Sequence, residues 1–312
     1  MGNLVNHIHD SGYKYLFSHS GFVKQLLENF IDMQWVKEID FSKLEKVNTS
    51  FIRKNYKNKE SDVIYKLSYK NKTAYLYLLI EFQSRVDKTM ALRIQSYVND
   101  FYEDLIKKDT QKEKYPVIFP VVIYNGDKKW DAVDNIVDMI EIFSDELRPY
   151  IPSLKYFKII INEFDKKALL KIRNTLASIF LIENLKEDEL EKYSRELANI
   201  VAEEIDINIK NAFINWFLRL VDDDRINNST NNVKSITHEE VKTMFSTTLE
   251  KIKIKERNEG KLEGLEKGIE KGIKKGIEKG KIEAAKGMKK EGFNFDVISR
   301  ITGLRMEEIE KL

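Results

Sequence analysis

The chain has 312 residues, 42% of them hydrophobic, and a formal net charge of +2 at pH 7, so it can build a large core as one big domain or two ordinary ones. It contains no cysteine, which excludes disulfides and thiolate zinc sites and fits a reducing cytoplasm. No run approaches the ~18 apolar residues of a membrane span, and the first residues lack a signal-peptide core. We therefore expect a cytoplasmic protein without membrane contact.

The N-terminal part predicts two helices and a strand. Asp10 and Ser11 are typical of a helix start, and residues 21–31 place their apolar side chains on one helical stripe. Residues 51–56 are the candidate for the first strand. His9 precedes the first helix without a further ligand cluster, which favours a cap or a phosphate contact over a zinc site.

Residues 61–83 predict a β-hairpin with two acids in unusual places. In residues 62–69 the apolar and polar side chains alternate, which is the period of a half-buried strand, and Asp62 opens the polar face. Residues 70–73 are turn-like, and residues 75–83 are almost wholly apolar until Glu81, as in a strand covered on both sides. Glu81 and Gln83 leave the same face about 7 Å apart. A carboxylate in such a run must be paired, protonated or bound to a metal.

Further strands and helices complete a mixed sheet. Residues 89–107 predict an amphipathic helix, and residues 117–124 and 157–161 predict strands. Because a helical crossover joins parallel strands, the strand at 117–124 should run parallel to an earlier one. Beyond residue 165 the strand signals stop, and helices are expected at 166–183, 187–204, 206–221 and 237–255.

The C-terminal region contains a repeat and a basic excess. Residues 251–291 carry 14 basic and 8 acidic side chains, whereas residues 1–250 carry 36 and 39. Glycine recurs every four residues from Gly260 to Gly280, so a glycine stripe would drift by about 40° per repeat around a helix. Each interior glycine costs about 1 kcal/mol of helix propensity. We expect either a helix that forms on self-association or DNA contact, or a flexible charged linker.

The last residues, 292–312, resemble a short helix, a turn at Thr302-Gly303 and a second helix. Such a unit can place a helix in the major groove of DNA, but Glu307, Glu308 and Glu310 on the second helix argue against base reading. Docking or oligomerisation is the preferred interpretation.

The hairpin motif, Asp62 followed by Glu81-Phe82-Gln83, resembles the core of the PD-(D/E)XK nucleases with glutamine in place of the usual lysine. Taken with the further motifs, the chain is similar to the recombination-promoting nuclease (Rpn) or PD-(D/E)XK transposase-like family of bacteria. These further motifs are His9-Asp10, Tyr13-Lys14, Leu16-Phe17, Met90 with Arg93 and Tyr97, residues 120–126, and Trp130.

The resemblance implies an α/β fold, a restriction-endonuclease-like mixed sheet flanked by helices, followed by a helical C-terminal region. We predict a nuclease-like domain at 1–165, a helical accessory region at 166–256, a glycine-repeat basic helix or linker at 257–291, and a helix-turn-helix-like tail at 292–312. An acid from a preceding helix, Asp10 or Glu28, can join the metal site in such folds, although a cap and a solvated surface residue are the better interpretations of these two.

The resemblance also implies a catalytic set of Asp62, Glu81 and Gln83. Mg²⁺, or Mn²⁺, would be held by Asp62, Glu81 and the backbone carbonyl of Phe82. A glutamine amide can orient water or donate to phosphate but cannot carry charge or act as a titrating base. DNA contacts are expected from Arg85, Arg93, His9 and Lys14.

Three interpretations stay open. The first is a Mg²⁺-dependent DNA endonuclease of low sequence specificity, which the resemblance links to recombination or transposition. The second is a DNA-binding protein that keeps the fold without cleavage. The third is a self-assembling scaffold, a homo-oligomer through the glycine-repeat tail, in which the acids pair with Arg53, Arg85 or Arg93 as a structural network.

Overall fold

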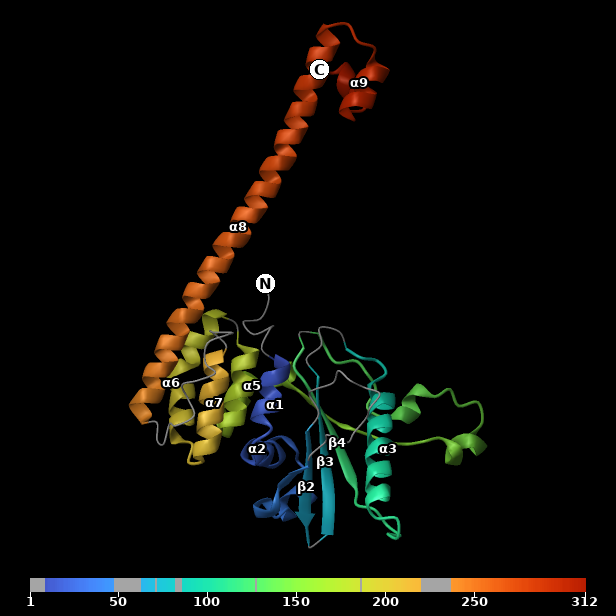
Figure 1. The fold of residues 1–312 in the computed structure, drawn as a ribbon, viewed down its shortest axis with the longest axis vertical. Helices are drawn as coiled ribbons and strands as arrows, with labels where there is room; N and C mark the ends of the chain where they lie inside the picture. Colours follow the sequence, from blue (N-terminus) through green and yellow to red (C-terminus); the bar gives the residue numbers. More distant parts are fainter. Residues whose placement is uncertain are drawn as a thin grey trace. The chain divides into compact units, whose positions relative to one another are not determined.

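The computed structural model describes residues 9–47, 63–70, 72–81, 86–126, 128–185, 187–219 and 237–312. Two compact units make up the chain, residues 1–249 and residues 250–312. The first contains a mixed five-stranded sheet with helices on both faces, and a helical region follows it (Figure 1). The predicted fold class is thereby confirmed.

The sheet has the order β1-β2-β3-β4-β5. Its first three strands are antiparallel neighbours, and β3, β4 and β5 run parallel to one another. The strands are β1 (Glu45–Val47), β2 (Val63–Tyr69), β3 (Lys72–Glu81), β4 (Ile118–Tyr124) and β5 (Phe157–Ile160). Because parallel strands end at one edge, the carboxyl ends of β3, β4 and β5 lie together.

The hairpin and the crossover agree with the sequence patterns. β2 and β3 pair from Val63↔Leu78 to Tyr69↔Lys72, and Lys70 takes the left-handed conformation that this tight turn needs, with φ at 45°. Helix α3 (Met90–Lys108) then carries the chain to β4, which is parallel to β3 as predicted. The strand expected at 51–56 lies outside the described residues.

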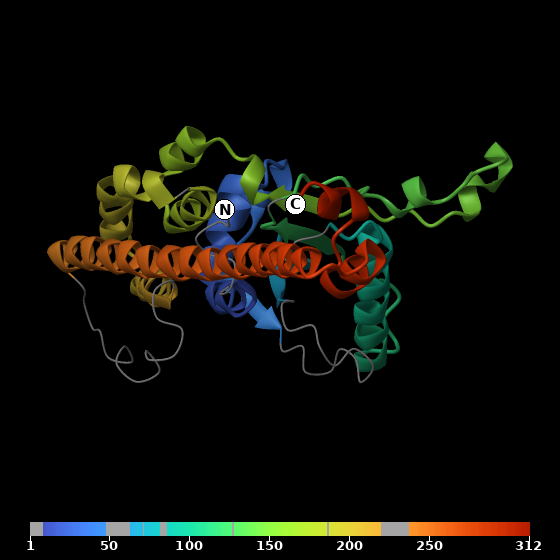
Figure 2. The same ribbon diagram turned by 90° about the horizontal axis from the view of Figure 1, so that it is seen from above.

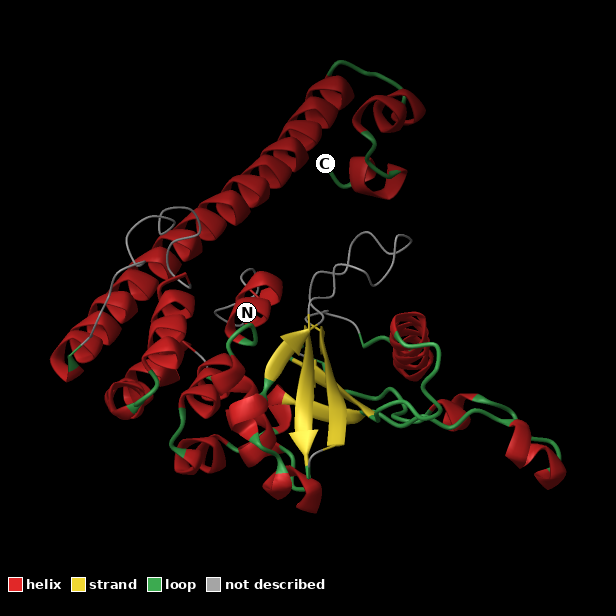
Figure 3. Cartoon of the chain, turned by 60° about the horizontal axis from the view of Figure 1, so that its bottom comes forward, coloured by secondary structure: helices red, strands yellow, loops and turns green. Residues whose placement is uncertain are grey.

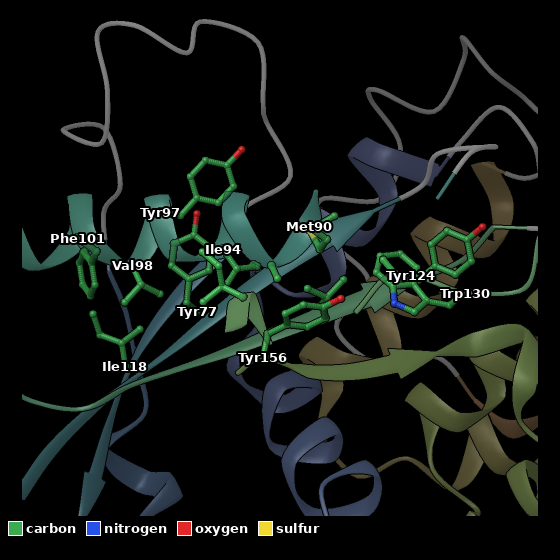
Figure 4. Packing of buried hydrophobic residues seen from close by; sticks show 14 of the residues in the cluster. Tyr77, Met90, Ile94, Tyr97, Val98, Phe101, Ile118, Tyr124, Trp130 and Tyr156 are labelled. Atoms are coloured by element: carbon green, nitrogen blue, oxygen red, sulfur yellow. The ribbon is translucent and has the colours of Figure 1, made fainter. Parts of the chain in front are cut away.

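One face of the sheet is covered by α3 (Figure 3). Its apolar stripe packs on side chains of β2, β3, β4 and β5 in a continuous core (Figure 4). The ring of Tyr77 stacks on that of Tyr97, with centroids 6.1 Å apart, and Tyr75 meets Phe101 edge-on at 5.0 Å. The predicted amphipathic helix therefore covers the sheet as its pattern indicated.

The opposite face is covered by α1 (His9–Leu16), α2 (Ser20–Phe30) and α5 (Thr175–Asn184) (Figure 1). The Tyr65 hydroxyl of β2 donates to the carbonyl of Phe17 at 2.9 Å. Gln25 of α2 donates to Glu204 at 2.9 Å and accepts from the Leu176 amide at 2.8 Å. The predicted nuclease-like and accessory regions thus share one compact unit, and the boundaries at 165 and 256 stay predictions.

Short 3-10 turns join these elements: Gln34–Glu38, Phe41–Lys43, Ile136–Met139, Asp145–Tyr150 and Ile161–Glu163. The third and fourth of them belong to a segment between β4 and β5 that extends away from the sheet (Figures 1 and 2). The bridge between Asn135 and Lys155 closes its base.

The helix predicted at 166–183 is two helices, α4 (Lys166–Ile172) and α5, so the single-helix prediction was wrong. Arg173 takes a left-handed conformation with φ at 52°, and the Asn174 side chain then caps α5 by accepting from the Ala177 amide at 2.7 Å. An N-cap signal inside an apolar run therefore prevailed over helical periodicity.

Helices α6 (Glu187–Glu203), α7 (Ile207–Arg219) and α8 (His238–Lys290) follow. The first turns of α8 pack on α7 through aromatic rings: Phe245 stacks on Phe217 at 4.4 Å and on Phe213 at 5.8 Å. The helix expected at 237–255 and the glycine repeat form one continuous helix, and its dependence on self-association or DNA contact stays a prediction.

Residues 250–312 contain the rest of α8, then α9 (Phe295–Thr302) and α10 (Met306–Glu310). Ala285, Ile298 and Ile309 form their small core. Gly303, with φ at 71°, makes the predicted turn. The Lys289 ammonium donates to the carbonyls of Ile309 and Glu310 at 3.1 and 2.9 Å, which fixes the end of the chain on α8.

Among the described residues, the structure has no helix of the length and hydropathy needed to span a bilayer.

Candidate active site at the carboxyl edge of the sheet

The ends of β3 and β4 meet at the candidate site. Glu81 is the last residue of β3 and pairs in register with Tyr124, the last residue of β4. β2 is antiparallel to β3 and begins at this same edge, where Val63 pairs with Leu78. Val63, the first residue of β2, is thus three positions from Glu81 in register, and the placing of Asp62 beside Glu81 stays a prediction.

The predicted site residues differ in how far the structure describes them. For Glu81 and His9 it describes the backbone, at the end of β3 and the start of α1, and not the side chain. Lys14 of α1 is half-buried, and Arg93 lies in α3. Four predicted residues lie outside the described part of the chain: Asp62, Phe82, Gln83 and Arg85.

Arg93, the predicted DNA contact, makes an ion pair within the fold. Its Nη1 lies 2.5 Å from Oδ2 of Asp87, and its guanidinium lies 5.9 Å from the Tyr97 ring centroid. Asp87 also accepts from the amide and the hydroxyl of Thr89, at 2.8 and 2.6 Å. Burial opposes ionisation of Asp87, but the hydrogen bonds from Thr89 and Arg93 outweigh it, so the pKa of Asp87 lies below its ordinary value. Arg93 therefore fastens the segment before α3, and its contact with DNA stays a prediction.

An aromatic cluster supports the end of β4 on the α3 side (Figure 4). Tyr124 meets Trp130 edge-on at 4.8 Å. The Tyr156 hydroxyl donates to the carbonyl of Val133 at 2.9 Å, and burial is the main cause that raises the pKa of Tyr156 to about 12. Tyr156 is therefore neutral near pH 7, and the cluster is a rigid apolar support for the strand end rather than a source of charge.

A polar group covers the same strand end on the other face. Asn125, the residue after β4, donates through Nδ2 to Oε2 of Glu183 at 2.7 Å. Glu183 lies in the last turn of α5 and is 6% exposed. Burial, and then the charge of Glu183, hold the pKa of the fully buried Tyr13 well above its ordinary value, so Tyr13 is neutral. The sequence patterns did not predict this group; a lone acid at the end of the mostly apolar run 176–182 is the signal that indicates it.

Two lysines bring positive charge to the face covered by α1. Lys46 of β1 pairs in register with Tyr65, whose hydroxyl reaches the end of α1. Partial burial, and then the charge of Lys14, lower the pKa of Lys46. Neither lysine makes a salt bridge within the described ranges. Two like charges without a counterion among the described residues are suited to an anionic ligand, and Lys46 was not among the predicted contacts.

Glu28, the alternative metal ligand from a preceding helix, lies elsewhere. It is exposed on α2, 3.9 Å from Lys24, and lines a cavity of about 470 Å³ together with Asp32, Val36 and Ile39. Ile39 forms a bridge with Tyr69, which pairs with the first residue of β3. This cavity is therefore at the opposite edge of the sheet from Glu81.

The residues predicted to hold a metal ion would supply only oxygen atoms as ligands. No group of three or more histidine, aspartate or glutamate side chains that could hold an ion occurs among the described residues. Two carboxylates and a backbone carbonyl form an all-oxygen set, which fits Mg²⁺ or Mn²⁺ rather than a thiolate or imidazole metal. The strand register brings Val63 and Glu81 to one edge of the sheet, and the predicted residues fit such an ion by the chemistry of their oxygen donors.

Comparison with known proteins gives relatives of the sequence. A family model described as "Putative transposase, YhgA-like" matches residues 7–212. The recombination-promoting nuclease RpnC of Escherichia coli K12 is 28% identical over 119 residues, which is 38% of this chain and 39% of the relative. RpnD of Escherichia coli O157:H7, also a recombination-promoting nuclease, is 26% identical over 122 residues, 38% and 46% of the two chains.

A third relative, the inactive recombination-promoting nuclease-like protein RpnE of Escherichia coli K12, is 26% identical over 119 residues, 38% of this chain and 39% of the relative. The chain thus spans less than half of the length of these curated relatives. No solved structure matches it.

Proposed function

Because the chain belongs to the family described as "Putative transposase, YhgA-like", we propose that it is a nuclease that hydrolyses phosphodiester bonds of DNA. The observation that carries the proposal is the pairing of Glu81 with Tyr124 where the parallel strands end. In open α/β sheets, ligands bind outside the carboxyl ends of the strands. Relatives named as recombination-promoting nucleases support the same class of activity, and we extend their link with recombination to this chain.

In this proposal Asp62, Glu81 and the carbonyl of Phe82 hold Mg²⁺ or Mn²⁺. When bound, such an ion would supply an activated water molecule and would neutralise charge that develops on the phosphate. Gln83 orients water or donates to a phosphate oxygen; it cannot take up a proton as a base.

DNA binding is proposed for the surface beside this edge. Lys14 and Lys46 meet the phosphate backbone, and Arg85, Arg93 and His9 are further candidates. Contacts to phosphate carry no base information, so we expect low sequence specificity and affinity that falls steeply with salt. A chain without cysteine suits the reducing cytoplasm, where we place this activity.

Nicking of supercoiled plasmid tests the proposal. The wild type is compared with Asp62→Ala and Glu81→Ala, each with Mg²⁺ and with EDTA. Glu45→Ala is the matched control, because Glu45 is an exposed acid of the same sheet that pairs with Lys66 at 3.5 Å. We expect cleavage by the wild type and the control only with metal, and none by the other two. Equal behaviour of all four proteins would contradict the proposal.

A second candidate is a DNA-binding protein that does not cleave. The relative RpnE, named as inactive, and the glutamine at position 83 favour it. This candidate predicts Mg²⁺-independent DNA retention that is lost when Lys14 and Lys46 are replaced by glutamine, with no cleavage by the wild type. Cleavage that depends on Glu81 would exclude it.

We also propose that the tail associates with a second copy of the chain. Leu265, Ile269, Ile273 and Ile277 form a seam along α8, and each is between 54% and 61% exposed. The glycines from 260 to 280 have open space around them, so a partner helix can approach closely. Light scattering should show that Ile273→Ser lowers the oligomeric state, whereas Lys275→Ser, on another column of the helix, does not. An unchanged mass for both variants would contradict self-association through this seam.

A further inference from the structure

Glu183 occupies a position that is unfavourable for an acid in three respects. It is the one charged side chain that is buried in the described part of the protein, at 6% exposure. It ends a helix that is buried on every side, from Thr175 to Glu183. It also lies in the last turn of α5, where the helix dipole is negative. Burial of an uncompensated charge costs several kcal/mol, so this carboxylate needs polar partners.

Asn125 is one such partner, and its hydrogen bond to Glu183 determines the orientation of the Asn125 side-chain amide. A carboxylate only accepts hydrogen bonds, so the contact of 2.7 Å to Oε2 must come from the amide nitrogen Nδ2 of Asn125. The amide plane is thereby fixed, and Oδ1 is directed away from Glu183. Asn125 is half-buried, and no described residue donates a hydrogen bond to Oδ1. The strand end therefore presents an oriented acceptor.

The surroundings hold this acceptor in place. Asn162 donates to the carbonyl of Gly126, and Asn184, the neighbour of Glu183, donates to the carbonyl of Ile161 at 2.6 Å. The last turn of α5 is thus bonded to the ends of both β4 and β5. Asn125 follows Tyr124, which pairs with Glu81, so the acceptor lies one residue beyond the paired ends of β3 and β4, on the face covered by α5.

We propose that Asn125 belongs to the active site, where its Oδ1 accepts a hydrogen bond from a water molecule, and that Glu183 is the positioning residue that orients it. The inference rests on the proposed hydrolytic function. Water is the donor that hydrolysis supplies at this edge, whereas a phosphodiester has no donor to offer. The hydrogen bond from Asn125 requires an acceptor atom on the side chain of residue 183, and it does not require a charge there.

Two double variants separate this role from a structural one. Asn125→Asp with Glu183→Gln reverses the hydrogen bond, because the new amide donates to the new carboxylate, and keeps an oxygen directed outward. Asn125→Leu with Glu183→Met replaces the pair with apolar groups of similar shape, which removes the acceptor and its hydrogen-bonding partner together. Asn125→Asp alone places two carboxylates together and should be unstable. All are compared with the wild type and Glu81→Ala by thermal unfolding and by DNA cleavage.

We expect both double variants to unfold near the wild-type temperature, the reversed pair to keep cleavage within about tenfold, and the apolar pair to lose at least about 100-fold. If the apolar double variant does not fold, two single variants give the same comparison. Glu183→Gln keeps the acceptor for Asn125, whereas Glu183→Met lacks it. The inference would be overturned, and the proposed function would stand, if the apolar double variant cleaved DNA at the full rate. The same conclusion would follow if both double variants folded but lost cleavage. A wild type no faster than Glu81→Ala would overturn the proposed function and the inference with it.

Discussion

Gly126, just after β4, is a position where one methyl group should disturb the candidate site. A Cβ on Gly126 would lie 2.7 Å from Cε2 of Tyr124 and closer still to Cζ and the hydroxyl oxygen. The Tyr124 ring is itself held edge-on by Trp130, with centroids 4.8 Å apart. Gly126→Ala must therefore strain the turn, at about 1–3 kcal/mol, or displace the ring and lose an aromatic pair of about 0.5–1.5 kcal/mol.

Denaturant unfolding followed by tryptophan fluorescence measures this cost, because all three tryptophans lie in residues 1–249 and Trp130 touches Tyr124. We expect Gly126→Ala to lower the free energy of unfolding by about 2 kcal/mol, and Tyr124→Leu in the same chain to restore part of it. The control is Gly272→Ala, which meets nothing within 4 Å and lies in the other unit, so this transition should not move. A Gly126→Ala protein as stable as the wild type would refute the packing argument.

Two further predictions concern the packing of α8 and the segment before α3. Phe245→Ala should lower the free energy of unfolding by about 3–5 kcal/mol, measured by denaturant titration, because Phe245 is 1% exposed between two rings of α7; a loss below about 1 kcal/mol would contradict it. Asp87→Asn should destabilise at pH 7 and cease to matter at low pH. The folded pKa of Asp87 is lowered, so its contribution is present above the unfolded pKa of about 3.9 and is lost as pH falls through the folded pKa. Melting of both proteins from pH 7 to pH 2.5 checks this, and a difference that does not depend on pH would exclude the ion pair as its cause.

The sheet was predictable because its strands follow simple periods. The alternation in residues 63–69 predicted β2, and the apolar run 117–124 predicted β4. The helical crossover α3 between β3 and β4 predicted that these two strands are parallel. The break at Arg173 was not predicted. Helical periodicity continues through it, and only the Asn174 cap, a signal of one residue, marks the start of α5.

Contacts at the candidate site between residues far apart in the sequence could not be predicted. Asn125 and Glu183 are 58 residues apart, and nothing in the composition of either segment pairs them. Their contact follows from the packing of α5 against the end of β4. Arg93 shows a related limit: the resemblance implied a contact with DNA, whereas in the structure its guanidinium pairs with Asp87.

Single-turnover cleavage of a labelled DNA duplex by the wild type and by Glu81→Gln, with enzyme in excess and binding measured in parallel, tests the central claim most directly. Under these conditions the rate reports chemistry rather than binding. Lewis-acid stabilisation by a held ion is worth several kcal/mol, so the account predicts equal DNA binding and a rate at least about 100-fold lower for Glu81→Gln. Equal rates for the two proteins would contradict a hydrolytic site at the end of β3.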